Sequence, residues 1–342
     1  MNKIVLHTVR IYIQLGLFFY YKKIIVNGKK SIPKDQPVLF LSNHQNALID
    51  ALLLATKSGR LSYFLTRAGV FKKPLVSRLL HSLNMRPIYR VRDGWSTIAK
   101  NKSVFSNTVN LLHDNKAVTI FPEGNHNLER RVRPLSKGFT RIILEHRDTY
   151  PKQSIHLIPV GLNYQAPKAM GSTVSIFFGE ALASKSYNHL DDFIATKQIK
   201  QDVFNSIISL TTHIPQSNYA SIVEKLNKLN VDFTNPNSVN HCIVSQFKTC
   251  QVKRVKQSNF KVLIKPILYL LLCVPILVWR HNIKPKIKEA EFLSTFRFAI
   301  SITVVPLWLF VISAIIWLAF NFVTSLIFIL GSLILILIYN KA

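Results

Sequence analysis

Acidic residues are scarce in this chain. Among its 342 residues, 16 Asp and Glu stand against 44 Lys and Arg, so the formal net charge at pH 7 is +28. A chain this basic implies an anionic partner, such as nucleic acid, an anionic bilayer surface or phosphorylated substrates. Only 18% of the residues are charged and 49% are hydrophobic, which excludes a largely disordered protein and indicates contact with lipid. We therefore expect an anionic membrane as partner, and no nucleic acid.

Cysteine is also scarce, and the common catalytic motifs are missing. Cys242, Cys250 and Cys273 form neither a C-x-x-C pair nor a metal-ligand spacing. We expect free thiols in a reducing compartment, no disulfide and no metal site. The sequence contains no G-x-S-x-G, H-E-x-x-H, G-x-G-x-x-G or G-x-x-x-x-G-K-S/T. Serine hydrolase, zinc protease, dinucleotide-binding and P-loop functions therefore have no support in the sequence.

The N-terminal segment is apolar but carries a polar face. In residues 4–21, His7, Arg10 and Gln14 fall at positions that share one side of a helix. No small-residue cleavage site follows, which excludes a secretory signal. The pattern predicts an amphipathic helix on the membrane surface. The alternative is a helix that packs against the domain.

Two apolar segments lie near the C-terminus. Residues 266–279 are fewer than the ~20 that a spanning helix needs, and Pro275 interrupts them, so we expect a re-entrant or interfacial segment. No charged residue occurs in 298–339, which is long enough for about two crossings of the hydrocarbon core. A hairpin that turns near Asn321 would return Lys341 to the basic side, which the positive-inside rule identifies as cytoplasmic.

Between these segments, short β-rich runs alternate with helical patterns. The alternation predicts an α/β layered domain with a largely parallel central sheet. The expected strands are 37–42, 61–65, 117–121, 155–160 and 174–178, and the expected helices are 47–56, 75–83, 97–113 and 135–146.

A histidine and a carboxylate follow the strand expected at 37–42. Asn43 and His44 come directly after the strand, and Asp50 lies in the next expected helix. A carboxylate on one imidazole nitrogen fixes the tautomer and raises the basicity of the other, so the pair can act as a general base toward a hydroxyl. The alternative is that Asn43 and Asp50 cap the turn and the helix while His44 makes a local hydrogen bond.

Two further polar clusters follow expected strands. Glu123 and Gly124 come directly after the strand at 117–121 and precede several cations: Arg130, Arg131, Arg133, Lys137 and Arg141. A carboxylate and a glycine followed by cations suit an acceptor that bears hydroxyls and a phosphate. Arg90 belongs to a third, basic run at 86–92, which suits either a phosphate or anionic lipid headgroups. A solvated basic face is the alternative for the cluster that follows Glu123, and a basic face against anionic lipid headgroups is the alternative for the run at 86–92.

In this order the residues resemble the four successive blocks of the glycerophospholipid acyltransferases. The blocks fall at 43–50, 87–90, 121–124 and 158–161, and the similarity extends over 26–180. The closest similarity is to bacterial 1-acylglycerol-3-phosphate acyltransferases.

This chain departs from the family pattern in three places. In the second block, Asn84 and Arg86 replace the usual glycine and aliphatic residue. Five residues separate His44 from Asp50 where the family has four. On a continuous helix the extra residue rotates Asp50 by ~100°, so the turn after His44 must absorb it if the pair is to meet. Asn125 and His126 replace the usual Thr-Arg, which leaves Arg133, Lys137 or Arg141 to supply the acceptor-binding cation.

The resemblance implies an O-acyltransferase of phospholipid biosynthesis. A fatty acyl group would move from acyl-CoA or acyl carrier protein to the free hydroxyl of 1-acylglycerol-3-phosphate, giving phosphatidic acid. His44 and Asp50 would be catalytic, no metal is expected, and no cofactor is expected beyond the acyl co-substrate. The substrate-binding residues would be Asn43, Arg90, Glu123, Gly124 and Lys137. The alternatives are an enzyme acting on glycerol 3-phosphate or a lyso-aminolipid, and a non-catalytic, basic, membrane-anchored binding protein.

We accordingly expect four regions. They are a surface helix (1–25), the acyltransferase domain (26–189), a peripheral helical segment (190–258) and a membrane region (259–342). We expect the protein on the cytoplasmic face of the inner (cell) membrane, integral through its C-terminal segments and in contact with acyl thioester and lysophospholipid.

Overall fold

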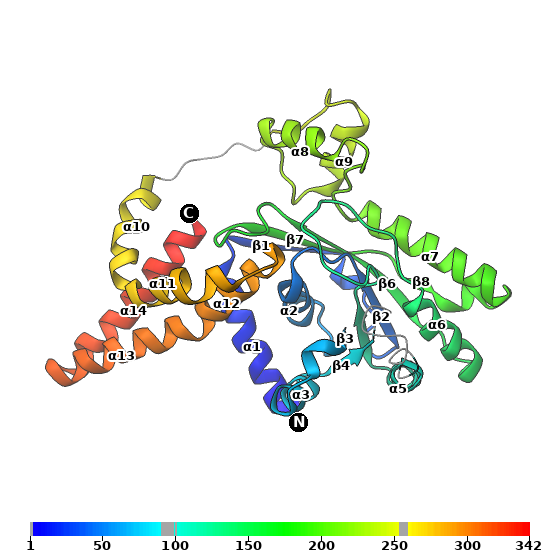
Figure 1. The fold of residues 1–342 in the computed structure, drawn as a ribbon, viewed down its shortest axis with the longest axis horizontal. Coiled ribbons are helices and arrows are strands. Elements are labelled where there is room, and N and C mark those ends of the chain that lie inside the picture. Colours follow the sequence, from blue (N-terminus) through cyan, green and yellow to red (C-terminus); the bar gives the residue numbers. More distant parts are fainter. Residues whose placement is uncertain (1–2, 90–98, 100, 253–258) are drawn as a thin grey trace.

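The centre of the protein is an eight-stranded sheet (Figure 1). The computed structural model describes residues 3–89, 99, 101–252 and 259–342. The main strand order is β1-β7-β6-β2-β5-β3-β4, with β8 paired to β6. Only β7 and β8 run antiparallel to their neighbour β6. The predicted α/β domain with a largely parallel sheet is thus confirmed. The strands are β1 (Lys23–Asn27), β2 (Val38–Ser42), β3 (Ser62–Arg67), β4 (Met85–Ile88), β5 (Ala117–Ile120), β6 (His156–Tyr164), β7 (Thr173–Phe178) and β8 (Leu182–Ala183).

Helices cover both faces of the sheet, so its central strands are buried on both sides. Along β2, Val38 and Phe40 join one apolar cluster, and Leu39 and Leu41 join the other, as the alternation of a strand requires. Strands buried on both faces are nearly continuous apolar runs, which made them recognisable in the sequence. The first cluster includes α1 (Lys3–Tyr20) and α2 (Ala47–Lys57), and the second includes α5 (Asn101–His113), α6 (Gly138–Thr149) and α7 (Asp192–Ser209).

Three strands were not anticipated. β1 and β4 lie at the two edges of the sheet, and β8 has two residues. β4 contains Pro87, which an edge strand tolerates because one of its sides needs no hydrogen bonds. The helix α3 (Pro74–Ser82) precedes β4 and buries none of its residues.

The N-terminal helix α1 is both packed and exposed. Leu17 and Tyr20 are buried, and Arg10 donates a hydrogen bond to the carbonyl of Thr56 on α2 at 3.4 Å. Ile4 and Ile11 are exposed on the other side. The helix therefore lies against the domain while an apolar stripe remains available to a membrane surface.

The C-terminal region consists of α10 (Asn259–Leu271), α11 (Cys273–Leu277), α12 (Leu293–Ile302), α13 (Val304–Ala319) and α14 (Phe322–Lys341). A bend of 90° separates the helix that ends at Leu271 from the one that starts at Cys273, as in a broken span or a re-entrant loop. Pro275 has no N–H to donate to the carbonyl of Leu271. Trp308 Nε1 on α13 donates to that carbonyl instead, at 2.9 Å, and so replaces the missing backbone hydrogen bond.

The hairpin expected near Asn321 is present (Figure 1). The Asn321 side chain caps α14, and the hydroxyls of Ser313 and Ser325 meet at 2.6 Å between α13 and α14. The helix over Ala290–Ala319 and α14 are each long and apolar enough to cross a membrane. Lys341 returns to the domain, where its ammonium donates to the carbonyl of Tyr21 at 2.9 Å.

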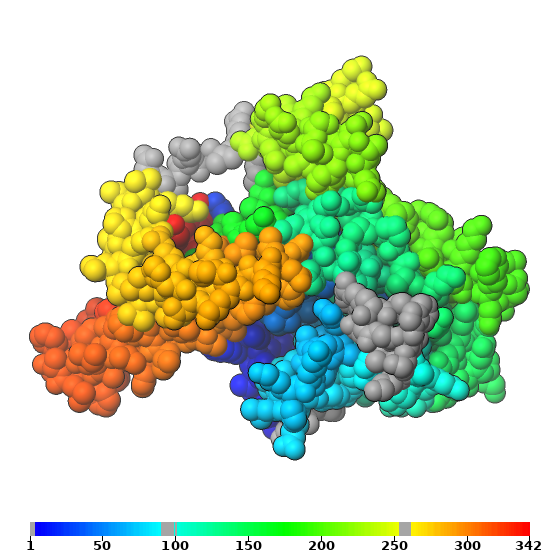
Figure 2. All heavy atoms as spheres, in the orientation of Figure 1, coloured from blue at the N-terminus to red at the C-terminus, as the bar shows by residue number. Residues whose placement is uncertain are grey.

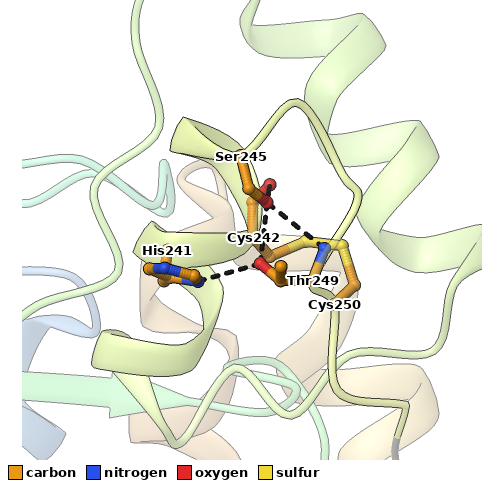
Figure 3. The surroundings of a disulfide bond; sticks show 5 residues. All are labelled: His241, Cys242, Ser245, Thr249 and Cys250. Atoms are coloured by element: carbon orange, nitrogen blue, oxygen red, sulfur yellow. Dashed lines mark hydrogen bonds between the residues drawn. A yellow bond between two sulfur atoms is a disulfide. The ribbon is translucent and has the colours of Figure 1, made fainter.

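A small helical unit follows α7. It contains α8 (Tyr219–Lys228) and α9 (Pro236–Val244), and it has an apolar cluster of its own. Within it Cys242 and Cys250 form a disulfide (Figure 3), so the expectation of free thiols is wrong for these two and holds for Cys273. Gln246 and Phe247 both have positive φ, which reverses the chain after α9 and brings the cysteines together.

Candidate active site

The polar residues that follow β2 and β5 share one edge of the sheet. Leu41 pairs with Ile120, so these parallel strands end side by side. Ligand sites of parallel α/β sheets form at the carboxyl ends of the strands. The loop after β2 carries His44, and the loop after β5 carries Glu123.

His44 and Asp50 form a hydrogen-bonded pair. The imidazole Nδ1 lies 2.8 Å from Asp50 Oδ2, and the carboxylate is completely buried. The Asn46 backbone N–H donates to the same oxygen at 2.7 Å, and the hydroxyl of Tyr164 on β6 donates to Oδ1. Both carboxylate oxygens are therefore occupied within the protein. The pairing leaves His44 Nε2 as the nitrogen for a substrate proton.

The turn between the two residues absorbs the longer spacing. Ala47, the first residue of α2, has φ +42°, in the left-handed region that residues with a Cβ rarely adopt. Asn46 before it has φ −130° and ψ 48°, which is neither helical nor extended. These two residues orient α2 so that Asp50 faces His44. The turn after His44 thus absorbs the extra residue and the pair meets. The left-handed conformation costs about 1 kcal/mol or more.

Aromatic groups surround the His44 imidazole. The ring stacks on Phe121 at 4.0 Å between centroids, and His126 meets it edge-on at 5.6 Å. The side chain is 14% exposed. Burial lowers the pKa of His44, and this effect outweighs the hydrogen bond that the ring donates to Asp50, which raises the pKa. The imidazole is therefore neutral at pH 7, the form that can accept a proton.

Glu123 is buried and paired with an arginine. Arg133 Nε donates to Glu123 Oε2 at 2.6 Å, and the same guanidinium bonds Asn125. The Glu123 side chain is 2% exposed. Burial raises the pKa of Glu123 to about 7, against the opposing charge of Arg133. Arg133 thus orders the loop after β5, and one of the three cations expected to bind the acceptor is engaged here.

The four remaining expected site residues are Asn43, Gly124, Lys137 and Arg90. Asn43 exchanges two hydrogen bonds with the backbone of Leu162, at 2.8 and 3.0 Å, and so ties the end of β2 to β6. Gly124 has φ +77° in the loop beside Glu123. Lys137 is exposed at the start of α6. Arg90 lies outside the described residues.

The pattern in the sequence did not indicate Tyr164 as part of the site. Tyr164 is 114 residues from Asp50 in the chain, and only the pairing of β6 with β2 brings them together. Phe121 opens the block at 121–124, but the sequence did not predict that its ring stacks on His44. Among the residues that the structure describes, no group of three His, Cys, Asp or Glu side chains could hold a metal ion.

Comparison with known proteins adds to this geometry. Residues 23–163 match the family model described as Acyltransferase. A chloroplastic 1-acyl-sn-glycerol-3-phosphate acyltransferase from Arabidopsis thaliana is 25% identical over 130 residues, 38% of this chain and 34% of that protein. Residues 23–163 are therefore an acyltransferase domain, similar in sequence to glycerophospholipid acyltransferases. His44, Asp50 and Glu123 all lie inside the matched region of this acyltransferase domain, and Tyr164 follows it directly.

Two other proteins are similar to part of this chain. Glycerol-3-phosphate O-acyltransferase 1 from Saccharomyces cerevisiae is 24% identical over 124 residues, 34% of this chain and 16% of that protein. The crystal structure of a 1-acyl-sn-glycerophosphate (LPA) acyltransferase from Thermotoga maritima covers 59% of this chain and 79% of its own, at 18% identity and a TM-score of 0.42. The chain matches about a third or less of the length of the curated relatives.

Proposed function

We propose that this protein is a membrane-bound O-acyltransferase that converts 1-acylglycerol-3-phosphate to phosphatidic acid. The observation that carries the proposal is the His44–Asp50 pair, at 2.8 Å, inside an acyltransferase domain. The acyl group comes from a thioester, acyl-CoA or acyl carrier protein, and no further cofactor is needed.

The reaction follows from the neutral imidazole. His44 Nε2 takes the proton of the acceptor hydroxyl as its oxygen attacks the thioester carbonyl. Asp50 orients the ring and stabilises the imidazolium that forms. The tetrahedral intermediate collapses to an ester, and the imidazolium returns its proton to the departing thiolate. No acyl-enzyme is required.

The acceptor assignment rests on chemistry and on the apolar surfaces. A lysophospholipid resides in the bilayer, which suits a domain joined to two apolar helices and to the exposed stripe of α1. Its phosphate requires a cation, and Lys137 with Arg90 is the proposed pair, since Arg133 already binds Glu123. We assign the domain to the cytoplasmic face of the cell membrane, where both acyl donors occur and where the net charge of +28 favours anionic lipid.

Acceptor-dependent thiol release tests this function. We expect the purified full chain to release thiol from palmitoyl-CoA, or from palmitoyl-acyl carrier protein, when lysophosphatidic acid is present and not in its absence. Glycerol 3-phosphate and a lyso-aminolipid, offered separately, distinguish the acceptors. A folded protein that releases thiol with no combination of these donors and acceptors contradicts the proposal and favours a binding protein.

A further inference from the structure

The segment that leads into α12 lies on the catalytic edge of the domain. Ser294 is buried, and its hydroxyl donates to the carbonyl of Pro167 at 2.6 Å. Arg297 donates to the next carbonyl, that of Lys168, at 2.7 Å. Asn46, two residues after His44, donates to Pro167 as well, at 2.9 Å. The loop after β6 therefore contacts both the start of α2 and the start of α12.

One histidine connects this segment to the catalytic pair. His126 Nε2 lies 3.0 Å from Glu289 Oε2, and its ring packs edge-on against Phe292 at 4.8 Å. The same ring lies 5.6 Å from that of His44. Figure 2 shows the orange C-terminal segment directly against the teal surface of the domain. Residues 163 positions apart thus meet beside the reacting imidazole.

We infer that the side chains of Glu289 and Phe292, on the turn before α12, form a wall of the active site and position His126 beside His44. The C-terminal region then does more than hold the enzyme on the membrane, because it limits which molecules reach the imidazole. The helix over Ala290–Ala319 begins at this turn, so an acceptor that lies in the bilayer is next to the wall. The identity of that acceptor as a lysophospholipid rests on the proposed function. Glu289 and Phe292 are positioning residues in this arrangement.

Residue-resolved carbethoxylation with diethylpyrocarbonate tests the wall without any activity assay. The full chain in detergent micelles is compared with Glu289→Gln and Phe292→Leu, and the modified histidines are quantified by mass spectrometry. Glu291→Gln is the matched control, since it removes the same charge two residues away, and the Glu291 side chain has no hydrogen bond or ion pair among the described residues. His113, exposed on α5, is the internal reference.

We expect Glu289→Gln to raise the modification rate at His126 and His44 by about two- to fivefold, the size of effect that the loss of a largely exposed ion pair allows. Phe292→Leu should raise the rate at His44 as well, and Glu291→Gln should leave both rates unchanged. Rates at His44 and His126 that equal those of the unaltered chain in both variants overturn the inference. Circular dichroism of each variant separates loss of the wall from loss of the fold.

The kinetic arm depends on acyl transfer by the unaltered chain. Glu289→Gln should then raise the KM for lysophosphatidic acid by about two- to fivefold and leave kcat within about twofold, because it alters access and not the base. Equal KM values for Glu289→Gln and the unaltered chain contradict the inference that Glu289 forms part of the active-site wall. If the unaltered chain transfers no acyl group, the proposed function fails, and the carbethoxylation result still decides the position of the turn.

Discussion

Asp50 is bound on both carboxylate oxygens before any substrate arrives. His44 and the Asn46 N–H share one oxygen, and Tyr164 donates to the other. A completely buried carboxylate depends on such partners, because an unpaired charge in the interior is strongly unfavourable. Burial raises the pKa of Tyr164 well above its usual range, so the phenol remains a donor. Tyr164 therefore holds Asp50 in the orientation that meets His44.

Tyr164→Phe should lower kcat/KM by about 10- to 100-fold, since a hydrogen bond to a charged group contributes about 1.5 to 3 kcal/mol. Thiol release measures the rate. Tyr187→Phe is the control, because it removes a hydroxyl that bonds Asp202 at 2.9 Å, outside the catalytic pair. A Tyr164→Phe enzyme as active as Tyr187→Phe contradicts the positioning role.

The pH dependence follows from the burial of His44. Its pKa lies below 6.5, so the ring is neutral above that pH and becomes protonated only under more acidic conditions. We expect kcat/KM to be constant from pH 6.5 upward until another group titrates, and to fall about tenfold per unit below the pKa of His44. A depressed histidine pKa also contributes stability that is present above 6.5 and is lost as the pH falls through the lowered value. A rate that rises as the pH falls from 6.5 contradicts the role of base.

The turn at the start of α2 compensates for the extra residue between His44 and Asp50. Ala47 takes a left-handed conformation, and this residue lets Asp50 turn back to His44. Glycine adopts that conformation freely, whereas a β-branched side chain is strongly strained there.

Ala47→Gly should therefore keep activity within about twofold, while Ala47→Val should cost about 1 to 3 kcal/mol of stability and lower activity by more than about tenfold. Thermal unfolding and thiol release on the same preparations check both effects. Equal behaviour of the two variants shows that the left-handed turn is not required.

The sequence predicted those elements that a short, continuous pattern of residues identifies. β2 and β5 were found because strands buried on both faces are continuous apolar runs. The Cys242–Cys250 disulfide was missed because it depends on a left-handed turn at Gln246 and Phe247. The same limit applies to the site. His44 and Asp50 are close in the chain, but Tyr164 and Glu289 reach it only through strand pairing and the packing of a distant helix.

In the whole molecule, α12 and the end of α14 pack against the domain. Phe298 on α12 is buried in the same cluster as α2, and its ring meets that of Tyr20 edge-on at 5.4 Å. Lys341 at the end of α14 bonds the carbonyls of Phe18 and Tyr21. The N-terminal helix α1 therefore contacts both α12 and the end of α14.

The full chain should remain in the membrane fraction at about 1 M salt, where the Debye length is only ~3 Å, and should require detergent for release. Headgroup attraction is screened under these conditions, whereas insertion of two apolar helices is not. Sedimentation of washed membranes followed by immunoblotting checks the outcome. Release by salt alone contradicts the assignment of α13 and α14 as membrane spans.

The base itself offers the most direct test. His44→Ala should lower the transfer of palmitate to lysophosphatidic acid by about 10²- to 10⁴-fold, because the acceptor hydroxyl loses the group that takes its proton. His113→Ala removes an exposed imidazole that stacks on Tyr150, and it should be fully active. Both are measured by thiol release on the purified full chain with matched circular dichroism. A His44→Ala protein that keeps more than about a tenth of the activity of His113→Ala contradicts the account, because general-base catalysis contributes far more than that.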